Sequence, residues 1–363
     1  MPRKGEGMRI KDQLSPRSYG QYIHLKVLFL ILLLCLTLFI ALAAIVCGSS
    51  GMPIGAVLRT LAGGGSTQEN VIVFNLRGPR VCTAIVAGFG LAIVGCVMQS
   101  VLRNPMASAS TVGVSQGAAF GAAFAIIALG AGVESVTTSG IVNVTQPYLV
   151  SGCAFAGAML STFCILLLSR VQKLSASTLV LTGVALGALF SGATTMLEYF
   201  ADDVRVAAVV YWTFGDLGGT YWKDIAMMLA VVLAAFVYFY FNRWNYNAIQ
   251  SGEETAKGLG VNTDALLLVG MLVCAFTAAM IVSNVGLINF VGLIAPHMVR
   301  RFVGSDYRFL LPASGLAGSI LLLLSDIVAR MAVSPVVLPI GAITSFVGAP
   351  VFLMIIFRES KRR

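Results

Sequence analysis

Residues 25–47 read LKVLFLILLLCLTLFIALAAIVC, a run of 23 residues in which Lys26 carries the only charge. At about 1.5 Å of rise per residue, a helix of this length covers roughly 34 Å, enough to cross a hydrocarbon core of about 30 Å. Of all 363 residues, 58% are hydrophobic and 11% are charged. Soluble domains carry roughly 25% charged residues. We therefore expect an all-α integral membrane protein.

The same apolar pattern recurs along the chain and predicts about ten membrane spans, joined by short Gly- and Pro-containing connections. The expected spans cover residues 25–47, 81–102, 112–133, 147–168, 178–200, 223–241, 265–283, 286–303, 309–331 and 338–357. This predicts one transmembrane domain over residues 25–357. A basic segment, residues 1–24, precedes it, and a basic tail, residues 358–363, follows it.

The distribution of basic residues predicts the orientation. With the N-terminus inside, 18 of the 24 lysines and arginines fall on the cytoplasmic side, as the positive-inside rule requires. Both termini are then cytoplasmic, and the protein is a multi-pass protein of the cytoplasmic membrane. The net charge of +9 thus reflects topology, so we expect membrane lipid and no nucleic acid as a partner.

The chain offers no energy source of its own. An ion-coupled secondary transporter is one alternative, but it usually keeps an ionisable residue deep in a span, and every acid here falls near a span end. Asp326 and Arg330 are spaced as an i,i+4 ion pair, which is typical of a structural contact. None of the seven lysines stands in G-x-x-x-x-G-K-[ST], so a P-loop is also missing. Any ATPase must be a separate chain.

Residues 247–264, NAIQSGEETAKGLGVNTD, predict a short cytoplasmic helix. Ser251 and Glu254 have the spacing of a capping box, and Gly258 and Gly260 can end the helix. A two-turn helix is marginal alone in water, so we expect its exposed Ala256 and Leu259 to pack on a partner. A solvated turn is the alternative.

A second break lies at residues 102–124, LRNPMASASTVGVSQGAAFGAAF. Gly113, Gly117 and Gly121 recur at every fourth residue, a spacing that lets a neighbouring helix approach closely. Tight packing is the first interpretation of this ridge. A role in lining a pathway is the second.

Four segments resemble the FecCD-type permeases, which are the membrane subunits of ATP-binding-cassette (ABC) importers for ferric siderophores, haem and vitamin B12. They are NLRGPRVCTAIVAGFGLAIVGCVMQSVLRNPMASASTVGVSQGAAFGA at residues 75–122, GEETAKGLGVN at 252–262, GLINFVGLIAPHMVRRFVGSDYRFLLPASGLAGSILLLLSDIVAR at 286–330, and LPIGAITSFVGAPVFLMIIFR at 338–358. Gly78 and Asp216 depart from the family's usual residues, which leaves the substrate less certain than the class.

The resemblance implies a type II ABC importer permease fold with an inverted repeat, in the cytoplasmic membrane of a prokaryote. It implies a homodimer, two copies of an ABC ATPase subunit and an extracytoplasmic substrate-binding protein. The permease is then not an enzyme, and it holds no metal or cofactor, because ATP and Mg bind the ATPase. Ferric siderophore is the first expected substrate, with haem, cobalamin and molybdate as alternatives.

The resemblance also assigns residues. It places Glu253, Glu254, Ala256, Lys257, Leu259 and Gly260 in a coupling helix that seats on the ATPase. It gives Arg77, Arg80 and Arg330 to docking of the binding protein, Ser175, Ala176 and Ser177 to a cytoplasmic gate, and Ser191, Thr195 and Tyr199 to the wall of the pathway.

Overall fold

The computed structural model describes residues 16–48, 52–131, 133–136, 142–144, 146–172, 176–334 and 336–360. The long helices are α2 (Pro16–Val46), α5 (Gly78–Val101), α7 (Pro147–Gln172), α8 (Ala176–Tyr199), α10 (Trp222–Phe241), α13 (Thr263–Val285), α15 (Tyr307–Met331) and α16 (Ile340–Ser360). The shorter ones are α3 (Ile54–Leu61), α4 (Thr67–Asn70), α6 (Val114–Ala123), α9 (Asp203–Phe214), α11 (Arg243–Gln250), α12 (Glu253–Gly258) and α14 (Val291–Val303). Two π-helical segments, η1 (Val71–Arg77) and η2 (Phe124–Ala128), continue α4 into α5 and α6 toward the next connection.

Each of the ten expected spans corresponds to a helix. Within the described residues, seven helices are long and apolar enough to cross a membrane, and the fold is an all-α membrane fold. The third span is shorter than expected, because residues 112–113 and 129–131 are not helical, and the eighth is shorter because residues 286–290 are not helical. The first span is longer, since α2 already begins at Pro16. Residues 1–15 and 361–363, at the two basic ends, lie outside the described part.

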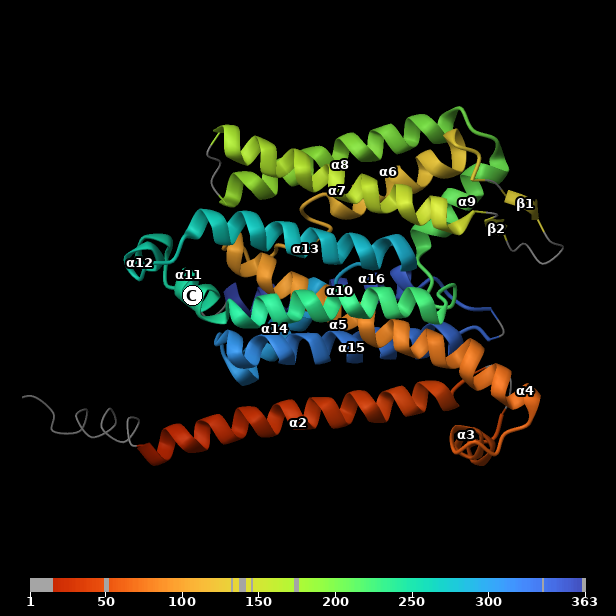
Figure 1. The fold of residues 1–363 in the computed structure, drawn as a ribbon, viewed down its shortest axis with the longest axis horizontal. Helices are drawn as coiled ribbons and strands as arrows, with labels where there is room; N and C mark the ends of the chain where they lie inside the picture. Colours follow the sequence, from red (N-terminus) through yellow and green to blue (C-terminus); the bar gives the residue numbers. More distant parts are fainter. Residues whose placement is uncertain are drawn as a thin grey trace, which may run out of the picture.

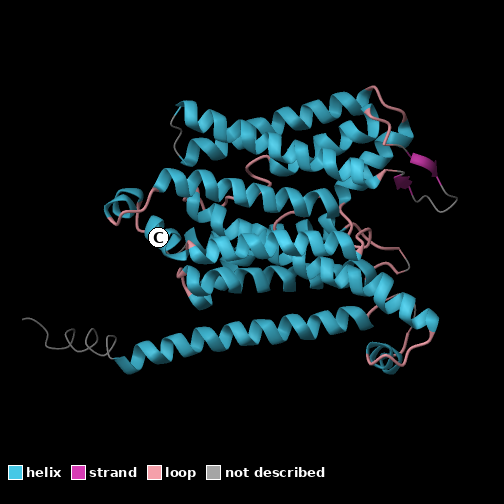
Figure 2. Ribbon diagram, viewed as in Figure 1, coloured by secondary structure: helices cyan, strands magenta, loops and turns pink. Residues whose placement is uncertain are grey.

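Helix α5 occupies the centre of the bundle, where it packs against α15, α13, α14 and α10. Helices α6, α7 and α8 form a second group, joined to the first through α7 and α13, and α2 lies along the opposite edge against α15 (Figure 1). Apart from the short antiparallel pair β1 (Val133–Val136) and β2 (Val142–Val144), the regular structure of the described chain is helical (Figure 2).

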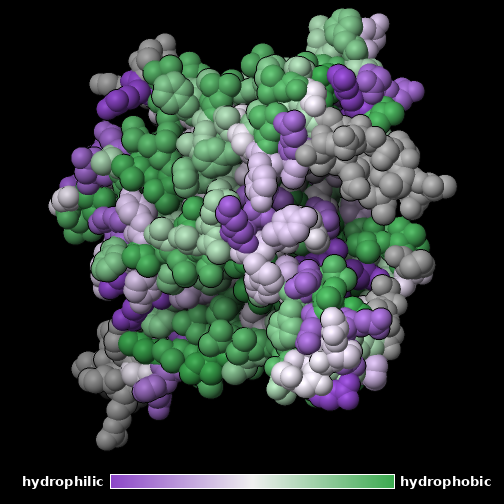
Figure 3. Space-filling model, turned by 45° about the vertical axis from the view of Figure 1, so that its right-hand side comes forward, coloured by the Kyte–Doolittle hydropathy of each residue, from purple (hydrophilic) through white to green (hydrophobic). Residues whose placement is uncertain are grey.

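The two ends of the bundle differ. The start of α2 and helix α12 lie at one end, which the positive-inside rule assigns to the cytoplasm. Helices α3 and α4 and the β1–β2 pair lie at the other, outer end (Figure 1). Hydrophobic residues cover the flank in Figure 3, while hydrophilic ones gather at the ends. This distribution matches a membrane band between two aqueous faces.

Glycines set the closest helix approaches. A Cβ at Gly117 would stand 2.5 Å from the carbonyl oxygen of Gly157 on α7, and one at Gly121 would overlap the carbonyl of Cys153. On α5, a Cβ at Gly95 would overlap the carbonyl of Gly292. The packing interpretation of the glycine ridge is therefore confirmed for Gly117 and Gly121.

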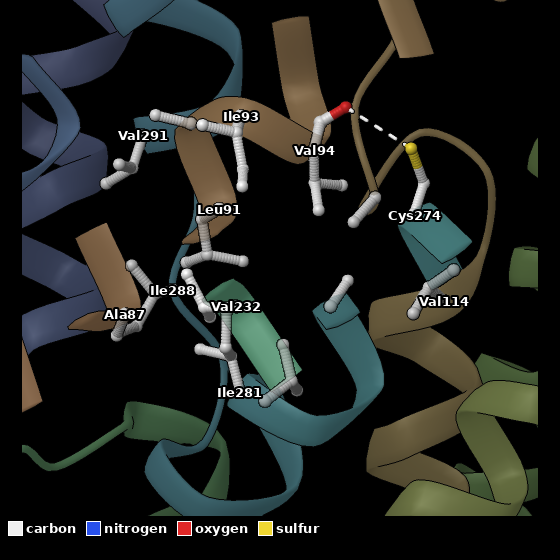
Figure 4. Close-up of a cluster of buried hydrophobic side chains, with 14 of the residues drawn as sticks. Ala87, Leu91, Ile93, Val94, Val114, Val232, Cys274, Ile281, Ile288 and Val291 are labelled. Carbon is white, nitrogen blue, oxygen red and sulfur yellow. Dashed lines mark hydrogen bonds between the residues drawn. The ribbon is translucent and has the colours of Figure 1, made fainter. Parts of the chain in front are cut away.

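The core between α5 and its neighbours is filled by small and branched apolar side chains. Leu91 and Val94 of α5, Val232 of α10 and Ile281 of α13 converge there, and the Cys274 thiol donates to the Val94 carbonyl at 3.7 Å (Figure 4). This core holds α5 rigidly between the two ends of the molecule.

Candidate functional site

Helix α12 is the element that projects at the cytoplasmic end. The carbonyls of Lys257 and Ala256 accept from the N–H groups of Gly260 (2.9 Å) and Val261 (3.0 Å), and Gly260 has φ +83°. This is a Schellman closure, which confirms Gly260 as the helix stop. The expected capping box is wrong: Gly252, with φ +114°, is the N-cap, so Ser251 lies one residue too early.

The residues of α12 divide into an outer and an inner face. The Glu254 side chain is 91% exposed, and Leu259 is 70% exposed. Ala256 is fully buried, so the expectation that it is exposed is wrong. Its methyl group faces the inside of the protein, because α12 rests against α11 and α13. Glu254 and Leu259 therefore form the outer face on which a partner could seat.

One ion pair ties α12 to the bundle, and two more lie within the helix. Arg103, just past the end of α5, donates from Nη2 to Glu253 Oε2 at 2.7 Å. Lys257 Nζ lies 3.1 Å from Glu253 Oε1 and 3.5 Å from Glu254 Oε1. The hydrogen bond from Lys257, with the nearby Arg103 charge, lowers the pKa of Glu253, and Glu253 in turn raises the pKa of Lys257. The sequence did not reveal the Arg103 contact, because the partners lie 150 positions apart.

At the outer end, Asp326 is the centre of an ion-pair cluster. Its carboxylate is fully buried and accepts from Arg80 Nε at 2.6 Å and from Arg330 Nε at 2.9 Å. Arg330 is the i,i+4 partner that the sequence predicted. Arg80 also approaches the exposed Asp216 at 3.5 Å. A buried carboxylate held by two guanidinium groups is neutralised in place.

The remaining donors of the cluster cap α2. Arg330 Nη1 donates to the Cys47 carbonyl at 2.6 Å, and its Nη2 donates to Ala44 at 3.0 Å. Arg77 Nη1 donates to the carbonyls of Ile45 (2.7 Å) and Val46 (2.9 Å). These are last-turn carbonyls with no partner inside their own helix, at the negative end of its dipole. The predicted docking arginines thus meet at one place, with their side chains largely inside the protein.

The predicted pathway residues lie together on α8. Ser191, Thr195 and Tyr199 are exposed along it, and the Thr195 hydroxyl donates to the Ser191 carbonyl at 3.1 Å. Of the predicted gate, Ala176 and Ser177 begin α8, whereas Ser175 and the side chains of all three lie outside the described part. Beside Ser191, a cavity of about 240 Å³ opens between α8 and the start of α6.

The chain is a membrane protein built as a bundle of spanning helices with a short helix projecting at one end, and the comparisons with known proteins specify its class. The chain is 45% identical to an ABC transporter permease protein of Methanocaldococcus jannaschii, over 96% of this chain and 99% of that one. It is 34% identical to the Fe(3+)-citrate import permease of Bacillus subtilis (92% and 96%) and 35% identical to the vitamin B12 import permease of Klebsiella pneumoniae (92% and 93%).

A solved structure agrees with these relatives. It is described as an inward-facing conformation of a transporter of the metal-chelate ABC type. It matches with a TM-score of 0.77 and 28% identity, over 92% of this chain and 99% of that one. The FecCD transport family model matches residues 33–358. The chain therefore belongs to the FecCD transport family. It is the permease of a metal-chelate type ABC importer, a membrane subunit and not an enzyme.

Proposed function

We propose that two copies of this chain form the permease of an importer that moves a metal chelate, with ferric siderophore first, across the cytoplasmic membrane by alternating access. Two ABC ATPase subunits power the transport from below, and an extracytoplasmic binding protein delivers the chelate from above. Relatives named for ferric citrate and for vitamin B12 are equally similar, at 34% and 35% identity. Haem, cobalamin and molybdate therefore remain the competing substrates.

The observation that carries this proposal is α12, a short capped helix that presents Glu254 and Leu259 to the cytoplasm. Burial of Ala256 and the ion pairs of Glu253 fix it to α5, α11 and α13. A force applied to its outer face therefore reaches the spanning helices rather than bending a loose turn. Glu253, Lys257 and Gly260 hold the helix, while Glu254 and Leu259 make the contact with the ATPase.

At the outer end, Arg77, Arg80 and Arg330 stand at the proposed docking surface. Their guanidinium groups already donate hydrogen bonds to Asp326 and to the carbonyls at the end of α2. We infer that they shape this surface and contribute positive potential to it. The contacts themselves fall to exposed charged residues at the same end, such as Asp202 and Asp216. Charge complementarity then sets the register and rate of docking more than its affinity.

The pathway is proposed to follow α8 along the dimer axis, with residues 175–177 as its cytoplasmic gate. Leu181, Val184 and Leu189 of α8 are well exposed in the single chain. Apolar positions alternate there with Ser191 and Thr195. A second α8 across the axis would cover this face and enclose the polar positions between the two copies.

The test is ATP-dependent uptake into vesicles that hold the permease with its ATPase and binding protein. Labelled ferric siderophore and labelled cobalamin are compared side by side. Siderophore uptake alone supports the proposal. Cobalamin uptake alone keeps the importer and replaces the substrate. ATP hydrolysis without uptake of either moves the search to haem and molybdate, and uptake that does not require ATP would overturn the coupling scheme.

A further inference from the structure

The connection between α5 and α6 lies deep in the bundle although it is not helical. Its backbone touches the first third of α8: a Cβ at Gly183 would stand 2.8 Å from the Val112 Cα and 3.0 Å from the Thr111 carbonyl oxygen. Gly183 lies roughly 10 Å along α8, and Ser191 roughly 22 Å, at about 1.5 Å per residue. Irregular backbone at such a depth is tolerated where it is enclosed by protein or lines a polar cavity.

Both conditions are met here. The backbone polar groups of Ser108 find their hydrogen-bond partner within the turn. The Thr111 hydroxyl accepts from the Ser108 N–H at 2.8 Å and donates to the Ser108 carbonyl at 2.9 Å. Next to it lies the cavity of about 240 Å³ noted above. Its lining holds four polar side chains and no charged one, and consists of Ser110, Thr111, Gln116, Gly183, Val184, Gly187, Ala188 and Ser191.

Gln116 is the decisive residue of this lining. Its Oε1 atom is buried and has no hydrogen-bond partner within the described chain. On the facing helix, a Cβ at Gly187 would stand 3.5 Å from the Gln116 Cδ, so glycine leaves room around the amide. An amide oxygen kept dry and unpaired costs free energy. That cost is removed when a donor enters the cavity.

We propose that Gln116, together with Ser110, Thr111 and Ser191, is a neutral hydrogen-bonding subsite that contacts the cargo part-way across the membrane. The inference rests on the proposed function and narrows it. A subsite without a cation suits a chelate that presents neutral N–H or O–H donors on its outer surface. It offers no cation to pair with the charge of a bare oxyanion such as molybdate.

The first test uses uptake by the complete transporter. Gln116→Leu keeps similar bulk and removes the acceptor, so uptake of a ferric hydroxamate siderophore, or of cobalamin where the parent carries that, should fall about two- to tenfold. The rate of ATP hydrolysis should stay unchanged, and the thermal unfolding temperature should stay the same or rise, because the unpaired amide oxygen is removed. Gln116→Asn is the matched variant and should retain part of the uptake. Parental uptake in Gln116→Leu would overturn the subsite while leaving the proposed importer intact.

The second test does not depend on the cargo. Gln116→Cys in the assembled transporter should react with a water-soluble, membrane-impermeant thiol reagent. Mass spectrometry of the peptide that contains residue 116 separates this reaction from that of the native cysteines. Ala118→Cys, on the same helix at a fully buried position, should stay unmodified. Equal protection of both positions would show that the cavity is closed to the pathway and would refute the subsite.

Discussion

Arg103 Nη2 and Glu253 Oε2 lie 2.7 Å apart and join the cytoplasmic end of α5 to the first residue of α12. Arg103 adopts φ +45°, a left-handed backbone that costs a non-glycine residue roughly 1–2 kcal/mol. The other end of the same helix carries Arg80, the partner of Asp326. One helix, α5, therefore connects the cytoplasmic end with the outer ion-pair cluster.

If the Arg103–Glu253 ion pair transmits the motion of α12, the attraction between the two side chains is required, but either one can carry the positive charge. Arg103→Glu should lower the number of chelates carried per ATP hydrolysed, because two carboxylates then repel each other across the joint. The combined change Arg103→Glu with Glu253→Arg should restore much of that ratio. Uptake and phosphate release measured in the same vesicles give the ratio directly.

The control is Arg59→Glu, which breaks another surface ion pair, with Glu69, at the outer end. Because exposed ion pairs contribute only about 0–1 kcal/mol, neither change should unfold the protein. A normal ratio in Arg103→Glu would remove the pair from the coupling route.

The outer face of α12 should be the site of ATPase binding. Glu254→Lys together with Leu259→Asp replaces the two exposed residues without touching the buried Ala256. The variant should fold, since neither side chain contributes to the core. It should release the ATPase on purification and lose nearly all ATP-driven uptake. Stable co-purification with normal uptake would contradict the assignment of α12.

The ion pairs of α12 should be insensitive to pH over the physiological range. The pKa of Glu253 is lowered from 4.5, so its contribution is present above that value and is lost as the pH falls through the lowered pKa. The pKa of Lys257 is raised from 10.5, so its contribution is lost only as the pH rises beyond that value. Amide hydrogen exchange of residues 253–260, corrected for its intrinsic rate, should be equal at about pH 6 and pH 9. A marked change between these values would indicate a different titrating partner.

The sequence predicted the spans well because apolar length is a local property that the bilayer requires of each helix. It also predicted the Asp326–Arg330 pair, whose partners are one helical turn apart. It missed the joining of Arg80 to Asp326 and of Arg103 to Glu253, because those contacts arise only when distant helices pack. Ala256 was placed on the wrong face for the same reason. The burial of a small residue depends on which neighbour covers it.

The candidate sites also divide into those with a local sequence signal and those formed only when distant helices pack. The resemblance supplied the roles of α12, the outer arginines and α8, and those roles stay predictions. Gln116 had no local signal apart from the glycine ridge around it. Its importance comes from an unpaired amide oxygen and from the space that Gly187 leaves on a facing helix. The inverted relation between the two halves of the chain stays a prediction.

Asp326 should be essential for stability rather than for transport chemistry. Asp326→Asn leaves Arg330 without a counter-charge and Arg80 with only the exposed Asp216, and breaking a buried pair costs about 3–5 kcal/mol. Asp216→Asn is the matched control. Its carboxylate is mostly exposed and lies 3.5 Å from the same Arg80, so it should cost less than about 1 kcal/mol. Thermal unfolding of the two purified variants compares them, and equal stability would rule out Asp326 as the anchor of α2.

Replacing glycine by alanine should distinguish glycines at close helix contacts from glycines that have open space beside them. Gly95→Ala forces a Cβ of α5 into the carbonyl of Gly292, so α14 must move away and the variant should express poorly or unfold at a much lower temperature. Gly152→Ala, on α7, meets nothing within 4 Å, and alanine favours the helix by roughly 0.5–1 kcal/mol over glycine. That variant should match or exceed the parent in thermal stability. If both variants behaved alike, the close approach of α5 and α14 at Gly95 would not be present in the membrane.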